Sequence, residues 1–229
     1  MHKYARLEGL SYRIVPVDNQ NNVELDISFK NMTEKFGYGN ANKQGVYFDE
    51  ENRRHINSLR QSHAMVALNL VDANKKDSAV KILNKYDNSV LEENCPYGMT
   101  SNRGNFHNRF SQTFLYAAYR AGDMNLAKKV HQSLKSDLDQ QMAYYQSLGD
   151  GVLNNDQLYA AAAQTLNGRA GGLSTEQEKF AGDIASVYQM LQQLNAWEKE
   201  FNPKTVSPTE NAPSTLPAPD SASPDTTNK

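Results

Sequence analysis

The sequence predicts an all-α fold of tetratricopeptide-like antiparallel helix pairs, with a short N-terminal strand and a disordered C-terminal tail. The main observation is an apolar helical pattern that occurs twice, 48 residues apart. Helix pairs that cannot bury their apolar faces alone stack on neighbouring pairs, so their sequence patterns recur at a fixed spacing. The matching positions are Val66, Ala67, Leu70, Ala79, Ile82 and Tyr86 in the first copy and Phe114, Leu115, Ala118, Ala127, Val130 and Leu134 in the second.

The repeat indicates packed helix crossings and a loop inserted between the two pairs. In each copy the second helix opens with a small residue, Ala79 or Ala127, which lets two backbones approach closely. The spacing also exceeds the ~34 residues of an ordinary tetratricopeptide repeat. The excess fits a loop, Asp87–Asn105, inserted between the two pairs.

Residues 1–48 are predicted to form an irregular segment with one strand and one helix. Leu10–Val17 alternates apolar and polar residues and is rich in β-branched and aromatic side chains, which is typical of a short strand stopped by Pro16. Asp26–Phe36 is predicted to be a helix that ends at Gly37 and Gly39.

Residues 49–202 are predicted to form the helical-repeat domain. The last helix is expected to begin at Ser174, because Ser174 and Gln177 form a capping box that satisfies two free amides. It carries one apolar stripe: Phe180, Ile184, Val187, Leu191 and Leu194. The expected helices before it are Asp49–Asp72 paired with Asp77–Val90, Asn105–Ala121 paired with Asp123–Leu148, and Asn155–Leu166.

Residues 203–229 are predicted to be a disordered tail. Six of the eight prolines lie here, and the segment has too little apolar area to offset the entropy of ordering. Asp220-Ser221-Ala222 and Asp225-Thr226-Thr227 resemble the Asp-Ser/Thr-small acceptor pattern of O-glycosylation in some Gram-negative periplasms. Ser221 and Thr226 are therefore candidate O-glycan acceptors. The alternative is an unmodified, solubilising tail.

Composition and charge argue against several classes of protein. The formal net charge of −2 and the pI near 6.2, without a basic stripe, argue against a nucleic-acid partner. The apolar runs are far shorter than the ~20 residues of a membrane-spanning helix, so no direct membrane insertion is expected. No apolar leader segment follows Met1.

No group of residues predicts catalysis, a metal or a cofactor. His55 and His63 lie two helical turns apart, too far to share a metal without other ligands. Cys95 is the single cysteine, which excludes an internal disulfide. A small hydrolase that uses Cys95 with His107 is a remote alternative, because a lone loop cysteine without a family signature is usually inert.

The loop before the third long helix is the candidate binding site. Polar side chains are dense between Pro96 and Arg109, and long loops inside compact helical repeats are often functional. Arg103 and Arg109, with the free amides of the helix start, are expected to hold an anionic or sugar-like group. The alternative is that these residues only cap the helix and tie down the loop. The candidate residues are Tyr97, Arg103, His107 and Arg109.

Several short stretches, in order, resemble landmarks of a known family. They are Arg6–Val17, Phe36–Gly39, Val46–Glu50, Asn57–Arg60, Tyr97–Met99, Ala118–Asp123 and Tyr144-Tyr145-x-x-Leu148. The family comprises bacterial multi-spanning membrane proteins, formerly a domain of unknown function, that are related to transmembrane protein O-mannosyltransferases. The resemblance covers residues 4 to about 200. It corresponds to the helical-repeat region that follows the catalytic membrane domain.

The resemblance implies a non-catalytic extracytoplasmic accessory domain of a membrane glycosyltransferase. The catalytic domain of that family has no counterpart in this sequence, so no catalytic residue carries over. The implied partners are the membrane-embedded glycosyltransferase domain and acceptor proteins, on the periplasmic face of the inner membrane. A free-standing chain would instead be cytoplasmic, because it shows no signal peptide. The alternative function is an independent scaffold that binds a protein or peptide.

Overall fold

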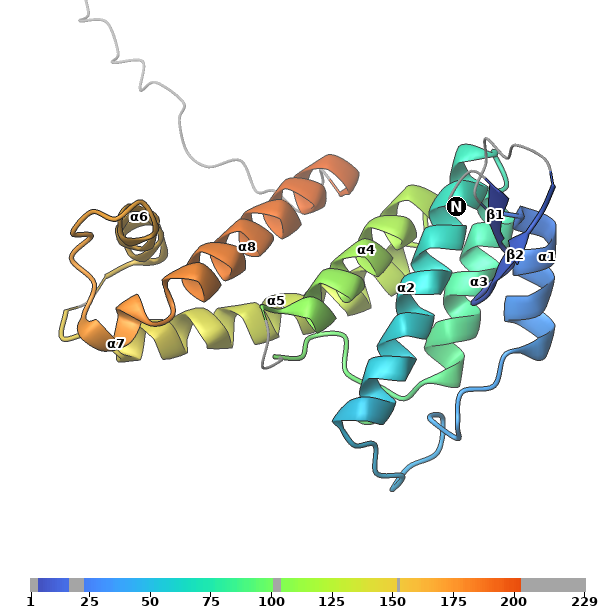
Figure 1. The fold of residues 1–229 in the computed structure, drawn as a ribbon, viewed down its shortest axis with the longest axis horizontal. Helices are drawn as coiled ribbons and strands as arrows, with labels where there is room; N and C mark the ends of the chain where they lie inside the picture. The colour runs from blue at the N-terminus through green and yellow to red at the C-terminus, as the bar shows by residue number, and fades with distance from the viewer. Residues whose placement is uncertain (1–3, 17–22, 101–103, 152, 203–229) are drawn as a thin grey trace, which may run out of the picture.

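The computed structural model describes residues 4–16, 23–100, 104–151 and 153–202. Over these residues the chain is mostly helical, with a short N-terminal hairpin of two strands, as Figure 1 shows. The predicted fold class is therefore confirmed in its helical content and its antiparallel helix pairs. The tail predicted for 203–229 lies outside the described residues.

The N-terminal hairpin pairs β1, Ala5–Leu7, with β2, Tyr12–Ile14, in antiparallel register. Only part of the predicted strand Leu10–Val17 is β2, and β1 was not predicted. The physical reason is the turn between the strands, in which the Glu8 N–H donates to the Ser11 oxygen at 2.9 Å. This turn uses residues that the alternating pattern assigned to the strand.

The predicted helix Asp26–Phe36 is confirmed with a change of geometry in its second half. The α-helix α1, Leu25–Lys30, continues without a break into a π-helical turn, η2, Asn31–Lys35. The chain leaves the helix at Phe36, whose backbone is extended. The side chain of Met32 is fully buried in the main core, so this segment is packed against the repeat domain.

The two predicted helix pairs are present, and each boundary lies within one residue of its expected position. The pairs are α2, Glu50–Asp72, with α3, Lys76–Ser89, and α4, Phe106–Ala121, with α5, Met124–Ser147. All twelve apolar positions that match between the two copies are buried. Ala79 and Ala127 are both fully buried, as their small size at a crossing predicts.

The turns inside the two pairs repeat the same backbone geometry. Asn74 (φ 59°) and Gly122 (φ 87°) are both in the left-handed region, and they also lie 48 residues apart. In both turns the next residue donates its N–H to the carbonyl oxygen five positions earlier, at 2.8 Å and 3.0 Å. This bond satisfies a free carbonyl at the helix end and reverses the chain sharply. The repeat therefore extends from the apolar positions to the turns.

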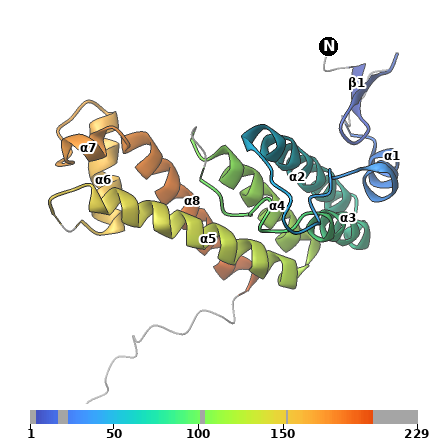
Figure 2. The ribbon, with the colours of Figure 1, turned by 90° about the horizontal axis from the view of Figure 1, so that it is seen from below.

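The C-terminal layer covers the second half of α5, which extends past α4 in Figures 1 and 2. It consists of α6, Asn155–Leu166, a short α7, Thr175–Glu178, and α8, Ala181–Phe201. Helix α8 packs against both α5 and α6. The capping box of Ser174 and Gln177 is confirmed.

The prediction of one continuous last helix is wrong, because the chain bends between α7 and α8. Phe180 has φ −108° and ψ 12°, outside the helical region, and begins α8 as its N-cap residue. Its ring centroid lies 5.5 Å from that of Tyr145 and 6.1 Å from that of Tyr144. The bend thus directs an apolar residue onto α5.

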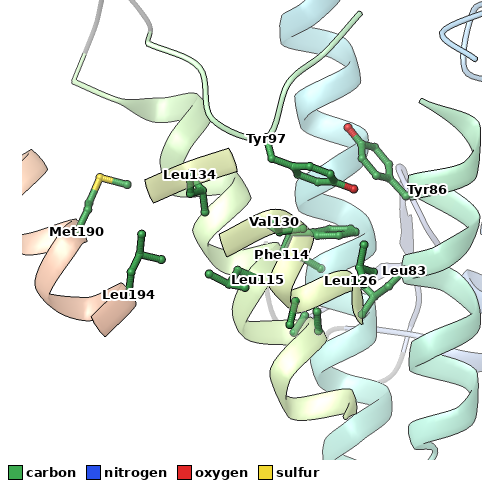
Figure 3. Close-up of a cluster of buried hydrophobic side chains, with 14 of the residues drawn as sticks. Leu83, Tyr86, Tyr97, Phe114, Leu115, Leu126, Val130, Leu134, Met190 and Leu194 are labelled. Atoms are coloured by element: carbon green, nitrogen blue, oxygen red, sulfur yellow. The ribbon is translucent and has the colours of Figure 1, made fainter. Parts of the chain in front are cut away.

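One apolar core runs through both helix pairs and into α8. Figure 3 shows Tyr86, Tyr97 and Phe114 gathered at one end of a buried cluster, with Met190 and Leu194 of α8 at the other. No helix in the described part of the chain is long and apolar enough to cross a membrane.

Candidate functional site

Arg60, in the middle of α2, ties the loop before α4 to the core. Its side chain is fully buried, and its guanidinium donates to the backbone oxygens of Cys95 (2.8 Å) and Pro96 (3.1 Å) and to Ser111 Oγ (2.6 Å). The ring centroid of Tyr97 lies 4.6 Å from the guanidinium carbon. A buried guanidinium is tolerated when its donors are satisfied. This stretch of loop is therefore part of the packed interior.

The two chemically notable side chains of this stretch are held in protonated forms. Burial raises the pKa of Tyr97 well above its ordinary value, and its hydroxyl donates to Asp87 at 2.8 Å. Burial likewise raises the pKa of the Cys95 thiol. Because the thiolate is the reactive form of cysteine, this environment favours an inert thiol over a nucleophile.

A polar network joins the same loop to α4 and α5. The carboxylate of Asp137, on α5, accepts hydrogen bonds from the Thr100 hydroxyl (3.1 Å) and from the side-chain amides of Asn108 (2.7 Å) and Gln141 (2.7 Å). Asn108 Oδ1 in turn accepts the N–H of Met99 at 2.9 Å. The donors to Asp137 are all neutral, and no described lysine or arginine forms an ion pair with it.

The network also includes Asn105, the residue immediately before α4. Asn105 is buried and has φ 56°, a left-handed conformation that asparagine tolerates better than most residues. Its side-chain amide exchanges two hydrogen bonds with that of Gln141, at 3.1 Å and 3.0 Å. The start of α4 is thereby held against the middle of α5.

A groove of about 470 Å³ opens beside this network. Its volume lies within the range of ~300–1,000 Å³ that is common for small-ligand sites. The loop, α5 and the start of α8 each form part of its wall. The lining residues are Thr100, Gly104, Asn105, Asp137, Gln140, Gln141, Tyr144, Tyr145, Phe180 and Asp183.

The aromatic side of the groove is supported by Gln177 of α7. This side chain is buried, and its amide donates to the backbone oxygen of Tyr145 at 2.9 Å. Gly149 packs directly on it, since a Cβ at position 149 would lie 2.5 Å from Gln177 Nε2. The rings of Tyr145 and Phe180 are packed together, while Tyr144 is 52 % exposed.

The groove is acidic as well as aromatic. Burial and the nearby carboxylate of Asp183 raise the pKa of Tyr145 to about 12. The side chain of Asp183 is half-buried, and within the described ranges it forms no hydrogen bond or ion pair. None of the lining residues that the structure describes is lysine, arginine or histidine. Two carboxylates, three rings and several neutral amides thus share one concave surface.

The structure does not gather the described loop candidates, Tyr97, His107 and Arg109, around one cavity. Tyr97 is 3 % exposed and belongs to the core. His107 is half-buried, and its Nδ1 has no partner among the described atoms. Burial, and to a smaller extent the positive charge of Arg60, lowers the pKa of His107. Arg109 is exposed and donates to Ser186 Oγ of α8 at 3.3 Å, in a second groove between α4 and α8. The candidates Arg103, Ser221 and Thr226 lie outside the described residues.

Several groove residues that sequence reasoning missed are polar side chains on α5 or at the start of α4. Asp137 and Gln141 lie four residues apart on the side of α5 that faces the loop. Asn105 and Asn108 are the matching polar positions at the start of α4. Buried amides spaced by three or four residues are a detectable signal, whereas the contribution of Phe180 and Asp183 depends on the bend before α8.

Comparisons with protein-family models, curated proteins and solved structures find no match to this chain. Within the described residues, no group of three or more histidine, cysteine, aspartate or glutamate side chains is placed to hold a metal ion.

Proposed function

We propose that this chain is a non-catalytic docking domain. In this proposal it serves as an extracytoplasmic accessory domain of a membrane glycosyltransferase related to the protein O-mannosyltransferases. Its role is to hold a segment of an acceptor protein in the groove between the loop before α4, α5 and the start of α8. The observation that carries the proposal is that the described residues already form this groove, and that hydrogen bonds hold its lining in place.

The support comes from hydrogen bonds that need no ligand. Asn105 and Gln141 hold the loop side to α5, and Gln177 holds the aromatic side to the same helix. A binding surface that is ordered in advance loses less conformational entropy when a partner binds. Helical-repeat domains commonly use such fixed concave surfaces for protein partners.

The glycosyltransferase context of the proposal rests on the family resemblance of the sequence. The alternative, an independent scaffold, would use the same groove for a protein or peptide. The two differ in whether the domain is joined to a membrane enzyme. Ten or more apolar helices encoded upstream in the same reading frame would support the accessory role, and a complete frame without them would support the scaffold.

Site-specific photo-crosslinking in cells tests docking directly. A photoreactive residue at Gln140, an exposed groove position, is expected to cross-link to a defined protein. The control is the same residue at Lys128, which is exposed on the same helix and lies outside the groove. Equal cross-linking from both positions, or none from Gln140, would contradict docking in the groove.

An activity assay tests the non-catalytic part of the proposal. The purified chain is expected to transfer no sugar from lipid-linked or nucleotide donors to protein extracts. Turnover that persists after all membrane material is removed would overturn it.

A further inference from the structure

His131 is a buried histidine at the contact between α5 and the end of α8, residues 195–201. It is only 7 % exposed, and its Nε2 has no hydrogen-bond partner among the described atoms. The carboxylate of Glu198, on the end of α8, lies 3.9 Å from this nitrogen. We propose that His131 makes the docking of the end of α8 sensitive to pH, with release in acid, and that Glu198 limits this release.

The described groups around His131 make its protonation costly. An imidazolium in a buried contact loses its hydration, and a nearby acid offsets only part of that loss. Glu198 of α8 supplies this attraction, whereas the positive charge of Lys135, one turn further along α5, opposes protonation. On α4, burial and Glu198 raise the pKa of Tyr119, so that hydroxyl stays neutral. Burial outweighs the attraction of Glu198 and lowers the pKa of His131 from its ordinary value of 6.5.

The direction of the pH effect follows from proton binding. The docked end of α8 keeps His131 neutral, whereas release exposes the imidazole to water, where it binds a proton more readily. Below about pH 6.5 the released form therefore binds more protons than the docked form, and lowering the pH favours release. Above that pH, docking keeps its full stability.

The end of α8 is the part of this helix that opens most easily. Leu194, which Figure 3 shows in the buried apolar cluster, is the last buried residue of α8. Residues 195–201 are half-buried or exposed. Two ring stacks, each with 5.0 Å between centroids, hold these residues to α4: Trp197 on Tyr116 and Phe201 on Tyr119. A segment with little buried area opens at a low cost in free energy.

Release of this segment changes one of the two grooves. Gln193 and Trp197 line the groove between α4 and α8, so that groove widens when the end of α8 leaves α4. The docking groove uses Phe180 and Asp183, at the opposite end of α8. The pH sensitivity is therefore independent of the proposed docking function.

Amide hydrogen exchange of the full chain tests the release. Protection factors of residues 195–201, corrected for the intrinsic pH dependence of exchange, are compared at pH 7.5 and pH 5.5. In the parent they are expected to fall roughly threefold or more in acid. In His131→Gln, whose side chain is polar but does not titrate, they should stay within about twofold. Each protein is compared with itself, so a general loss of stability in the variant does not mimic the effect.

Two acidic residues of α8 provide a matched pair of variants. Glu198→Gln removes the attraction for the imidazolium, so protection should fall further in acid than in the parent. Glu200→Gln removes the same charge from an exposed position and should behave like the parent. His63→Gln, a change at a buried histidine of α2, should also keep the parent's response in residues 195–201, because the release is local.

A measurement on the parent alone completes the test. The ring of His131, followed by NMR, should titrate below the ordinary histidine value of 6.5, and a midpoint at or above that value would overturn the proposal. Protection in residues 195–201 that does not change with pH in the parent, or that falls equally in His131→Gln, would do the same. Equal responses of Glu198→Gln and Glu200→Gln would remove the role of Glu198.

Discussion

Asn105 and Gln141 exchange two amide hydrogen bonds across the space between the start of α4 and the middle of α5. Both side chains are buried, and both also contact the Asp137 network, Gln141 directly and Asn105 through Asn108. The pair therefore connects the loop that was expected to carry function with the helix that forms the groove. Disrupting this pair should affect stability and binding together.

Gln141→Leu is expected to destabilise the protein by roughly 1–3 kcal/mol, because it leaves the buried Asn105 amide without its partner. Urea unfolding followed by circular dichroism measures the change. Gln140→Leu is the control: this neighbour is exposed, so the free energy of unfolding should change by no more than about 0.5 kcal/mol. A Gln141→Leu variant as stable as the parent would contradict the network's structural role.

Ala127→Leu is expected to destabilise the protein by about 1–3 kcal/mol, because a larger side chain overpacks the fully buried start of α5. Ala79→Leu, the equivalent change in the first copy, should have a similar effect, since Ala79 is also fully buried. Lys128→Leu on the exposed face of α5 serves as the control. Thermal melting compares the three variants, and an Ala127→Leu protein that melts like the parent would mean that the crossing is wrongly placed.

Arg60→Met is expected to destabilise the protein by roughly 2–4 kcal/mol, because the loop oxygens of Cys95 and Pro96 lose buried donors. Arg60→Lys should rescue little, because an ammonium does not reproduce the planar set of donors. Limited proteolysis should show faster cleavage near residues 95–100 in both variants.

The exposed Arg54 provides the control for that experiment, and Arg54→Met should leave both stability and cleavage nearly unchanged. If Arg60→Lys is as stable as the parent, the individual guanidinium hydrogen bonds do not hold the loop.

Acid is expected to destabilise the protein through His63, which is fully buried. Its Nδ1–H donates to the Leu59 oxygen at 2.8 Å, and its Nε2 accepts the Tyr38 hydroxyl at 2.9 Å. Desolvation lowers the pKa of His63 from 6.5 to about 4, so the folded state keeps it neutral. Between those values the unfolded state binds more protons. The contribution of His63 to the free energy of unfolding is therefore complete above about pH 7. It is lost as the pH drops toward 4, by up to about 3 kcal/mol.

The comparison of parent and His63→Gln isolates this effect from other titrating groups. Unfolding free energies measured from pH 7.5 to 4.5 should fall less steeply in the variant. His55→Gln, at an exposed position, should keep the slope of the parent. Parallel curves for parent and His63→Gln would show that His63 does not titrate as described.

The tail residues Ser221 and Thr226 stay candidate O-glycan acceptors. If they are modified, the intact mass of the native protein from its own host should exceed the sequence mass by whole sugar units. Changing both residues to Ala should remove the added mass. An unshifted native mass would exclude this modification.

The sequence by itself determined the two helix pairs, the turns inside them and the buried repeat positions. Each of these depends on local spacing, on turn chemistry such as Asn74 and Gly122, or on caps such as Asp49, whose carboxylate accepts the Asn52 N–H at 2.8 Å. Such signals act over a few residues, so they can be recognised without knowledge of distant contacts. The resemblance to a membrane-protein family suggested a glycosyltransferase context. The comparisons with known proteins do not test that context, so it stays a proposal.

Only the tertiary structure decided where the groove lies and which residues line it. Asp137 and Asp183 are 46 positions apart in the sequence, and they share a surface because α8 folds back on α5 after the bend at Phe180. A different long-range contact placed Tyr97 in the core: Arg60 of α2 donates to the backbone oxygens of Cys95 and Pro96 and lies over the Tyr97 ring. Burial and long-range pairing depend on how helices pack, and the local sequence pattern carries little of that information.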